Sequence, residues 1–144
     1  MKEIKIFKRV PEDALEIRKT VFVDEQGFVD DVEKIDDTAT HLVAYIDGKA
    51  VGTCRTFRIE GNSFILGRMA VLMEYRNTGI GGSLIKEAEM EIARMGGEEI
   101  IIHAQLHATP FYEFNGYCRF GEIEYEQDKP HATMKKILAN GDAK

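Results

Sequence analysis

The sequence predicts an α/β fold in which a sheet of mixed strand direction carries helices on both faces. Three features support this prediction. Alternating apolar and polar segments are separated by segments with helical spacing, an Asp-Gly pair separates two apolar runs, and a glycine-rich turn joins an apolar run to an amphipathic helix. The expected order of elements is β-α-β-β-β-α-β-α-β-β. The 144 residues are expected to form a single domain, 1–144.

The first segments predict a strand, a helix and an acidic loop. Apolar and polar residues alternate over 3–9, which is typical of a strand. A helix is expected from Pro11 to about Asp24, because proline suits a first helical turn and Gly27 is suited to ending the helix. Residues 30–40 are acidic and lack a clean period, so we expect a loop with at most a short helix there.

The central segment predicts three consecutive antiparallel strands. An Asp-Gly pair at Asp47-Gly48 predicts a hairpin, because both residues of such a turn adopt positive φ. A second turn at 61–63 contains glycine and asparagine. The expected strands are 41–47, 49–60 and 64–72.

After the glycine turn the sequence predicts a helix, a buried strand, a short helix and two last strands. One helical face carries Ile80, Leu84, Ala88, Ile92 and Met95, and Gly96-Gly97 caps the helix. The run 98–104 is almost continuously apolar, as in a buried parallel strand. A short helix over 109–116 would have Thr109 as N-cap and Gly116 past its end. The last strands are expected at 117–122 and 131–138.

The composition excludes some classes of partner. The net charge of −6 argues against nucleic acid and against an anionic membrane, because both require a basic footprint. No stretch approaches the ~20 apolar residues of a membrane span, and the first ten residues lack the apolar region of a signal peptide. Cys54 and Cys118 lie far apart and outside any metal-binding spacing, so we expect reduced thiols, no metal and a cytoplasmic protein.

The glycine turn is a candidate anion site. A phosphate-binding P-loop needs a lysine that this turn lacks, and the dinucleotide pattern needs glycine where Leu84 stands. The remaining pattern is RxxGxG over 76–82, between an apolar strand and a long helix. Glycines let the backbone approach an anion, and the first turn of a helix offers unpaired N–H groups. Tight helix–strand packing is the alternative explanation for these glycines.

Three segments resemble the GNAT superfamily of N-acetyltransferases. RMAVLMEYRNTGIGGSLI, 68–85, resembles its acetyl-CoA-binding motif, and QLHATPFYEFNGY, 105–117, resembles its second motif. LEIRKTVFVDEQGF, 15–28, resembles an opening found in the ElaA-like and YjcF-like groups. The resemblance implies a mostly antiparallel mixed sheet and an enzyme that uses acetyl-CoA as co-substrate.

The resemblance also implies which residues bind the coenzyme. The backbone of the strand before the turn would pair with the pantetheine arm, and the turn would hold the pyrophosphate. Gln105 stands where the family usually has asparagine, and its amide could bond the pantetheine. The implied residues are Met69, Ala70, Val71, Arg76, Asn77, Thr78, Gly79, Ile80, Gly81, Gly82 and Gln105.

The resemblance assigns Tyr112 as the general acid that protonates the leaving thiolate. A core position for its ring is the alternative. Glu25 is the first candidate for the general base, and a solvated helix-end carboxylate is the alternative reading of that residue. His41 and His107 are the other candidates for the base.

The sequence therefore predicts an N-acetyltransferase that acts on a primary amine of a small molecule or peptide by direct attack in a ternary complex. A non-catalytic sensor of coenzyme A or acyl-CoA is the alternative, and a nucleotide-binding fold is a third possibility. Arg55, Arg58 and Arg68 lie on the central strands, where an inward arginine would suit a carboxylate on the acceptor and a surface position is the alternative. A homodimer is possible.

Overall fold

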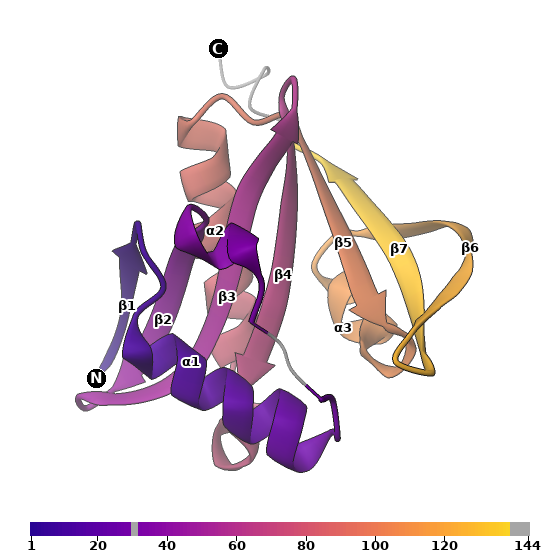
Figure 1. The fold of residues 1–144 in the computed structure, drawn as a ribbon. Helices are drawn as coiled ribbons and strands as arrows, with labels where there is room; N and C mark the ends of the chain where they lie inside the picture. Colours follow the sequence, from indigo (N-terminus) through magenta and orange to yellow (C-terminus); the bar gives the residue numbers. More distant parts are fainter. Residues whose placement is uncertain (30–31, 139–144) are drawn as a thin grey trace. The chain divides into compact units, whose positions relative to one another are not determined.

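The computed structural model describes residues 1–29 and 32–138. Its strands follow the sheet order β1-β2-β3-β4-β5-β7-β6 (Figure 1). The strands are β1 Lys2–Phe7, β2 Thr40–Ile46, β3 Lys49–Glu60, β4 Ser63–Val71, β5 Glu99–Gln105, β6 Cys118–Glu126 and β7 Lys129–Ile137. The main helices are α1 Glu12–Arg18, α2 Ile80–Arg94 and α3 Thr109–Phe114. The predicted order of elements is confirmed.

The described chain groups into two compact units. The first contains Met1–Phe57 and Arg68–Ala88, and the second contains Arg58–Gly67 and Glu89–Lys144. The expectation of one domain stays a prediction. None of the helices in the described part of the chain is long and apolar enough to cross a membrane.

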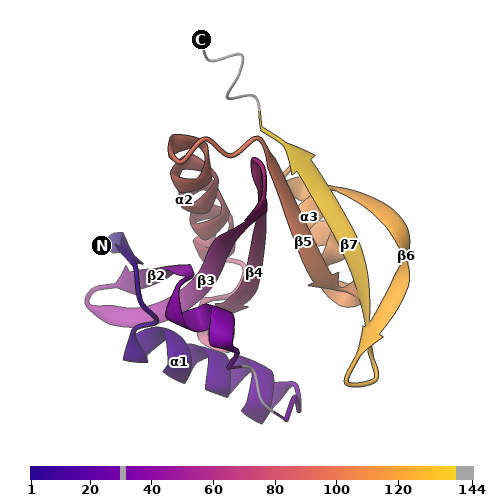
Figure 2. The same ribbon diagram turned by 45° about the horizontal axis from the view of Figure 1, so that its top comes forward.

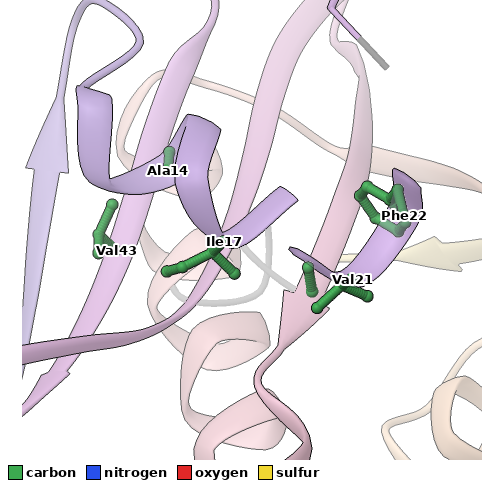
Figure 3. Close-up of a cluster of buried hydrophobic side chains, with 6 residues drawn as sticks. Ala14, Ile17, Val21, Phe22 and Val43 are labelled. Atoms are coloured by element: carbon green, nitrogen blue, oxygen red, sulfur yellow. The ribbon is translucent and has the colours of Figure 1, made fainter. Parts of the chain in front are cut away.

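In the first unit, α1 continues into a π-helical segment, η1 Lys19–Glu25, and together they cover one face of β2. Ala14, Ile17, Val21 and Phe22 of this helical segment pack with Val43 of β2 (Figure 3), and Ala70 of β4 belongs to the same buried cluster. The first half of α2 lies on the opposite face of the strands (Figures 1 and 2). Helices on both faces, as predicted, are thus confirmed.

The hairpin turn and the glycine helix end predicted from the sequence are both present. Asp47 and Gly48 both have positive φ, 48° and 86°, and β2 pairs antiparallel with β3 across them. Gly27 ends the helical segment with φ 81°. In the segment 30–40, residues 30–31 lie outside the described residues, and a short 3₁₀ helix, η2 Lys34–Asp37, follows them.

In the second unit, β5 pairs parallel with β4 and antiparallel with β7, which pairs antiparallel with β6. α3 lies on one side of β5 and β7 in both views (Figures 1 and 2). The last strands are longer than the sequence suggested, because their residues keep pairing down to the turn that joins them.

One prediction in this unit is wrong. Ala108, not Thr109, is the N-cap of α3, since the 3₁₀ turn η4 Leu106–Ala108 leads directly into the helix. The hydroxyl of Thr109 donates to the Leu106 carbonyl at 3.0 Å instead of accepting a helix N–H.

Candidate functional site

The glycine turn joins β4 to α2 within the first unit. A 3₁₀ turn, η3 Met73–Tyr75, follows the strand, and α2 begins at Ile80. Asn77 and Gly79 take left-handed conformations, with φ 64° and 90°, and a β-carbon on Gly79 would meet nothing within 4 Å. The loop therefore presents open backbone next to the first turn of α2, whose N–H groups have no acceptor inside the helix.

Gly52 of β3 fixes where α2 begins. A β-carbon at this position would lie 2.9 Å from Cγ2 of Ile80 and 3.1 Å from Cδ1 of Leu84. The missing side chain lets the first turns of α2 pack directly on the strand. This packing holds the N-terminus of α2, the positive end of its dipole, close to β3.

Arg76 and Glu25 form a bidentate ion pair. Nη1 and Nη2 of Arg76 donate to the two Glu25 carboxylate oxygens at 2.6 and 2.7 Å, while Nε donates to the Val71 carbonyl at 2.8 Å. The hydrogen bond from Arg76 lowers the pKa of Glu25 below its usual range, and the same bond raises the pKa of Arg76. Thus the structure brings together the predicted base candidate and the predicted pyrophosphate turn, in a form that makes Glu25 a weaker base.

A buried ionic network lies in the same unit. Arg18 of α1 holds the Asp36 carboxylate through two hydrogen bonds of 3.0 and 2.9 Å, and Arg55 of β3 donates to it at 2.8 Å. Arg18 and Asp36 are each 1% exposed. Burial by itself raises the pKa of Asp36, but the hydrogen bonds from Arg18, from the Glu33 backbone and from Arg55 outweigh it and hold this pKa well below its usual range.

His41, one of the alternative bases, belongs to this interior. Its Nε2 lies 3.0 Å from the Asp36 carbonyl, and burial lowers the pKa of its imidazole. The side chain is 0% exposed. A fully buried imidazole is poorly placed to accept a proton from a bound amine, so His41 is better explained as part of the network.

The second unit contains the other predicted site residues. Gln105 ends β5 and precedes η4, and His107 is exposed on η4. Tyr112 is 6% exposed, and its ring makes edge contacts with Phe111 and Tyr117 at centroid distances of 5.0 and 6.1 Å. The ring of Tyr112 is therefore buried, whether or not its hydroxyl takes part in the reaction.

Tyr117 is tied to its surroundings by its hydroxyl, which donates to Glu89 at 2.8 Å. Lys136 donates to the same carboxylate at 3.0 Å and to the Asn115 carbonyl at 3.0 Å. The backbone N–H of Tyr117 also donates to the Tyr112 carbonyl at 3.0 Å. These bonds fix the end of α3, and with it the backbone of Tyr112.

Comparison with known proteins gives the family of the chain. Residues 12–138 match the family described as "Acetyltransferase (GNAT) domain". The chain belongs to the GNAT acetyltransferase family. The "Uncharacterized N-acetyltransferase YjcF" of Bacillus subtilis is 34% identical over 127 residues, which cover 86% of this chain and 90% of that protein.

Two solved structures share the GNAT fold. Escherichia coli ElaA has a TM-score of 0.85 at 23% identity, covering 94% of this chain and 99% of its own. An aminoglycoside 6'-N-acetyltransferase complexed with coenzyme A has a TM-score of 0.75 at 18% identity, covering 94% and 96%. The predicted fold class is confirmed, and the chain is a GNAT-type N-acyltransferase.

The buried network of Arg18, Asp36 and Arg55 does not follow from the sequence pattern. Asp36 lies in an acidic segment without periodicity, so nothing in the sequence distinguishes it from its exposed neighbours. Arg18 did carry a signal, since it stands at helical spacing among the apolar residues that α1 and η1 bury. Of the three arginines noted on the strands, Arg58 is held by the carbonyls of Gly61 and Met95 at 2.6 and 2.7 Å.

Proposed function

We propose that this GNAT enzyme transfers the acetyl group of acetyl-CoA to a primary amine of a small molecule or peptide by direct attack within a ternary complex. The observation that carries the proposal is the turn before α2. Two left-handed residues, Asn77 and Gly79, open the backbone next to the helix N-terminus, and the Arg76 guanidinium lies on the same turn. This combination suits a pyrophosphate, because the N–H groups and the helix dipole favour negative charge, while Arg76, paired with Glu25, holds the turn in place.

The coenzyme would extend along β4. The backbone of 69–71 would pair with the pantetheine arm as an added strand, and the turn 76–82 would receive the pyrophosphate. Ala70 is buried, while Met69 and Val71 are half-buried, so side-chain packing and backbone binding are compatible here. Gln105 is proposed as a further contact from the end of β5.

The reaction needs no covalent enzyme intermediate. The amine nitrogen attacks the thioester carbonyl carbon, a C–N bond forms, and the C–S bond breaks with its electron pair leaving on sulfur. The thiolate takes the hydroxyl proton of Tyr112, the attacking nitrogen loses its proton to water, and water returns a proton to the tyrosinate. Tyr112 is therefore proposed as the general acid, and the edge contacts of its ring would hold the hydroxyl in one orientation.

For Glu25 the ion pair supports a positioning role. Its carboxylate orients the Arg76 guanidinium, and its lowered pKa opposes proton uptake near neutral pH. The assignment of Glu25 as general base stays a prediction.

We also propose that the enzyme is cytoplasmic and that it can form a homodimer. Cys54 and Cys118 are both free cysteines, the first buried and the second exposed. Size-exclusion chromatography with light scattering would measure the oligomeric state directly.

Calorimetric titration of the purified chain with acetyl-CoA, ATP and NAD tests the proposal. Selective binding of acetyl-CoA at micromolar Kd, about −8 kcal/mol, is the expected result. Release of free thiol from acetyl-CoA on addition of an amine would then establish turnover. If the chain bound ATP or NAD but did not bind acetyl-CoA, the proposal would be overturned.

A further inference from the structure

Two lysines of the first unit lie on the face of the sheet that α2 covers. Lys2 of β1 is directly opposite Ile46 of β2, and Ile46 is directly opposite Lys49 of β3. Residues that are directly opposite each other project from the same face of a sheet, so these three side chains form one row. The side chain of Lys2 reaches Ser83 of α2, which shows that the row is on the α2 face.

The two ammonium groups contact the residues on either side of the glycine turn. Nζ of Lys2 donates to Oγ of Ser83, in the first turn of α2, at 2.6 Å. Nζ of Lys49 lies 5.4 Å from the ring centroid of Tyr75, the last residue of η3. Tyr75 immediately precedes the turn 76–82, and Ser83 immediately follows it. β1 and β3 therefore bring one cation to each end of the segment that is proposed to hold the pyrophosphate.

Neither lysine is neutralised by a carboxylate in the part of the chain that the structure describes. The hydrogen bond of Lys2 goes to an uncharged hydroxyl, and the contact of Lys49 is with an aromatic ring. Asp47, in the turn between β2 and β3, pairs with the N-terminal ammonium group and with neither lysine. Both lysine side chains are exposed. Two positive charges are thus accessible beside the turn.

The guanidinium group of the turn itself does not supply this charge. Arg76 donates to both carboxylate oxygens of Glu25, so the pair carries no net charge. The N–H groups of the first turn of α2 suit a pyrophosphate, but coenzyme A carries a further phosphate on the 3′ carbon of its ribose. A phosphate monoester has a charge of about −1.5 to −2 at pH 7, and lysine binds phosphate as a point charge. The two lysines match this additional phosphate in charge.

We infer that Lys2 and Lys49 bind the 3′-phosphate of coenzyme A, so that the enzyme selects the 3′-phosphorylated coenzyme. This inference rests on the proposed function. A single ribose separates the 3′-phosphate from the pyrophosphate, so a pyrophosphate at the turn keeps the 3′-phosphate near it. Two cross-strand steps of about 5 Å separate the Cβ atoms of the lysines, a span that two flexible four-carbon stems can close around one phosphate. Lys2 can keep its bond to Ser83, because an ammonium group has three N–H donors.

Calorimetric titration with coenzyme A and with dephospho-coenzyme A, which lacks only the 3′-phosphate, tests this inference. We expect the wild-type chain to bind coenzyme A about 10- to 100-fold more tightly, the range of a hydrogen bond to a charged group. In Lys2→Gln/Lys49→Gln this ratio should fall to about 1, because the affinity for coenzyme A falls while that for dephospho-coenzyme A stays the same. Lys2→Arg/Lys49→Arg should keep a preference for coenzyme A, since both positive charges are retained.

Lys5→Gln is the matched control. It removes a lysine from the same strand, β1, but Lys5 is opposite Val43 and projects from the other face, where its Nζ lies 5.1 Å from the ring centroid of Tyr45. The preference for coenzyme A should therefore be unchanged in this variant. An unchanged Kd for dephospho-coenzyme A in Lys2→Gln/Lys49→Gln shows that the double variant is folded and that its turn is intact.

The outcomes separate this inference from the proposed function. If the wild-type chain binds neither coenzyme A nor dephospho-coenzyme A, the proposed function fails, and this inference fails with it. If the wild-type chain binds both equally tightly, only this inference is overturned. A preference that persists in Lys2→Gln/Lys49→Gln would also overturn it. Equal losses of affinity for both ligands in that variant would overturn it too, because they would assign the lysines to the pyrophosphate.

Discussion

The carboxylate of Glu25 accepts two hydrogen bonds of 2.6 and 2.7 Å from Arg76, although the two residues are 51 positions apart in the chain. The pair connects the end of the π-helical segment η1 to the glycine turn, and Arg76 in turn holds the Val71 carbonyl. The geometry of the turn therefore depends on a residue of the first helical segment. Glu25 and Arg76, both candidate site residues, therefore depend on each other for their positions.

Replacing either member of this pair should raise KM for acetyl-CoA more than it lowers kcat. Glu25→Gln and Arg76→Gln are each expected to raise KM about 3- to 10-fold, which corresponds to the ~0.7–1.4 kcal/mol of one modest charged contact. The reason is that both variants loosen the same turn. Steady-state kinetics with varied acetyl-CoA and saturating amine would measure the effect.

The double variant Glu25→Gln/Arg76→Gln distinguishes positioning from base catalysis. If the residues act as a pair, its KM should be no higher than that of the worse single variant. A general base would behave differently. Its loss would lower kcat by about 10²- to 10⁴-fold and remove the acidic limb of the pH–kcat profile, and either result would restore Glu25 as the base.

Asp36→Asn should destabilise the protein strongly. The change leaves Arg18 and Arg55 buried with a neutral partner, and breaking a buried ion pair on one side costs about 3–5 kcal/mol. Chemical denaturation at pH 7 would measure the loss. Asp24→Asn is the matched control, because Asp24 is 55% exposed and its contact with Lys19 at 3.2 Å should contribute at most about 1 kcal/mol.

The same carboxylate predicts a pH dependence of stability. The pKa of Asp36 is lower in the folded chain than in the unfolded chain, so its contribution is present above the unfolded value of about 3.9 and is lost as the pH falls toward the folded value. The difference in unfolding free energy between wild type and Asp36→Asn should therefore shrink below about pH 4. A difference that stays constant from pH 7 to pH 3 would contradict this account.

Gly52→Val should lower both stability and affinity for acetyl-CoA. The new side chain would be forced against Ile80 and Leu84, and overpacking of this kind costs about 1–3 kcal/mol. Movement of the first turn of α2 would also displace its N–H groups. Thermal unfolding and calorimetry with acetyl-CoA would measure the two effects. Gly67→Val is the steric control for stability, since a β-carbon there would meet nothing within 4 Å.

Local patterns predicted most of the fold, because strand alternation, turn residues and helix spacing act over a few neighbours. The positive φ of Asp47 and Gly48 followed from their residue types. Thr109 shows the limit, since a favourable capping residue can be drawn into the helix when a 3₁₀ turn precedes it. The pairing of Glu25 with Arg76 and the burial of Asp36 depend on contacts between distant segments, which no local pattern records.

Tyr112→Phe should remove most of the turnover while leaving acetyl-CoA binding intact. If the hydroxyl protonates the leaving thiolate, its loss should lower kcat by about 10²- to 10⁴-fold. The phenyl ring keeps the edge contacts with Phe111 and Tyr117, so the Kd for acetyl-CoA should change by less than about 2-fold, below the ~1 kcal/mol of a typical lost hydrogen bond. Thiol release and calorimetry would measure the two quantities.

Tyr117→Phe is the matched control for this prediction. It also removes one phenol hydroxyl, but that hydroxyl donates to Glu89, a structural contact. Its loss should reduce stability by about 1 kcal/mol and leave kcat within a few-fold of wild type. If Tyr112→Phe retained full turnover, Tyr112 would not be the acid. Equal losses of kcat in both variants would instead assign the effect to distortion of α3.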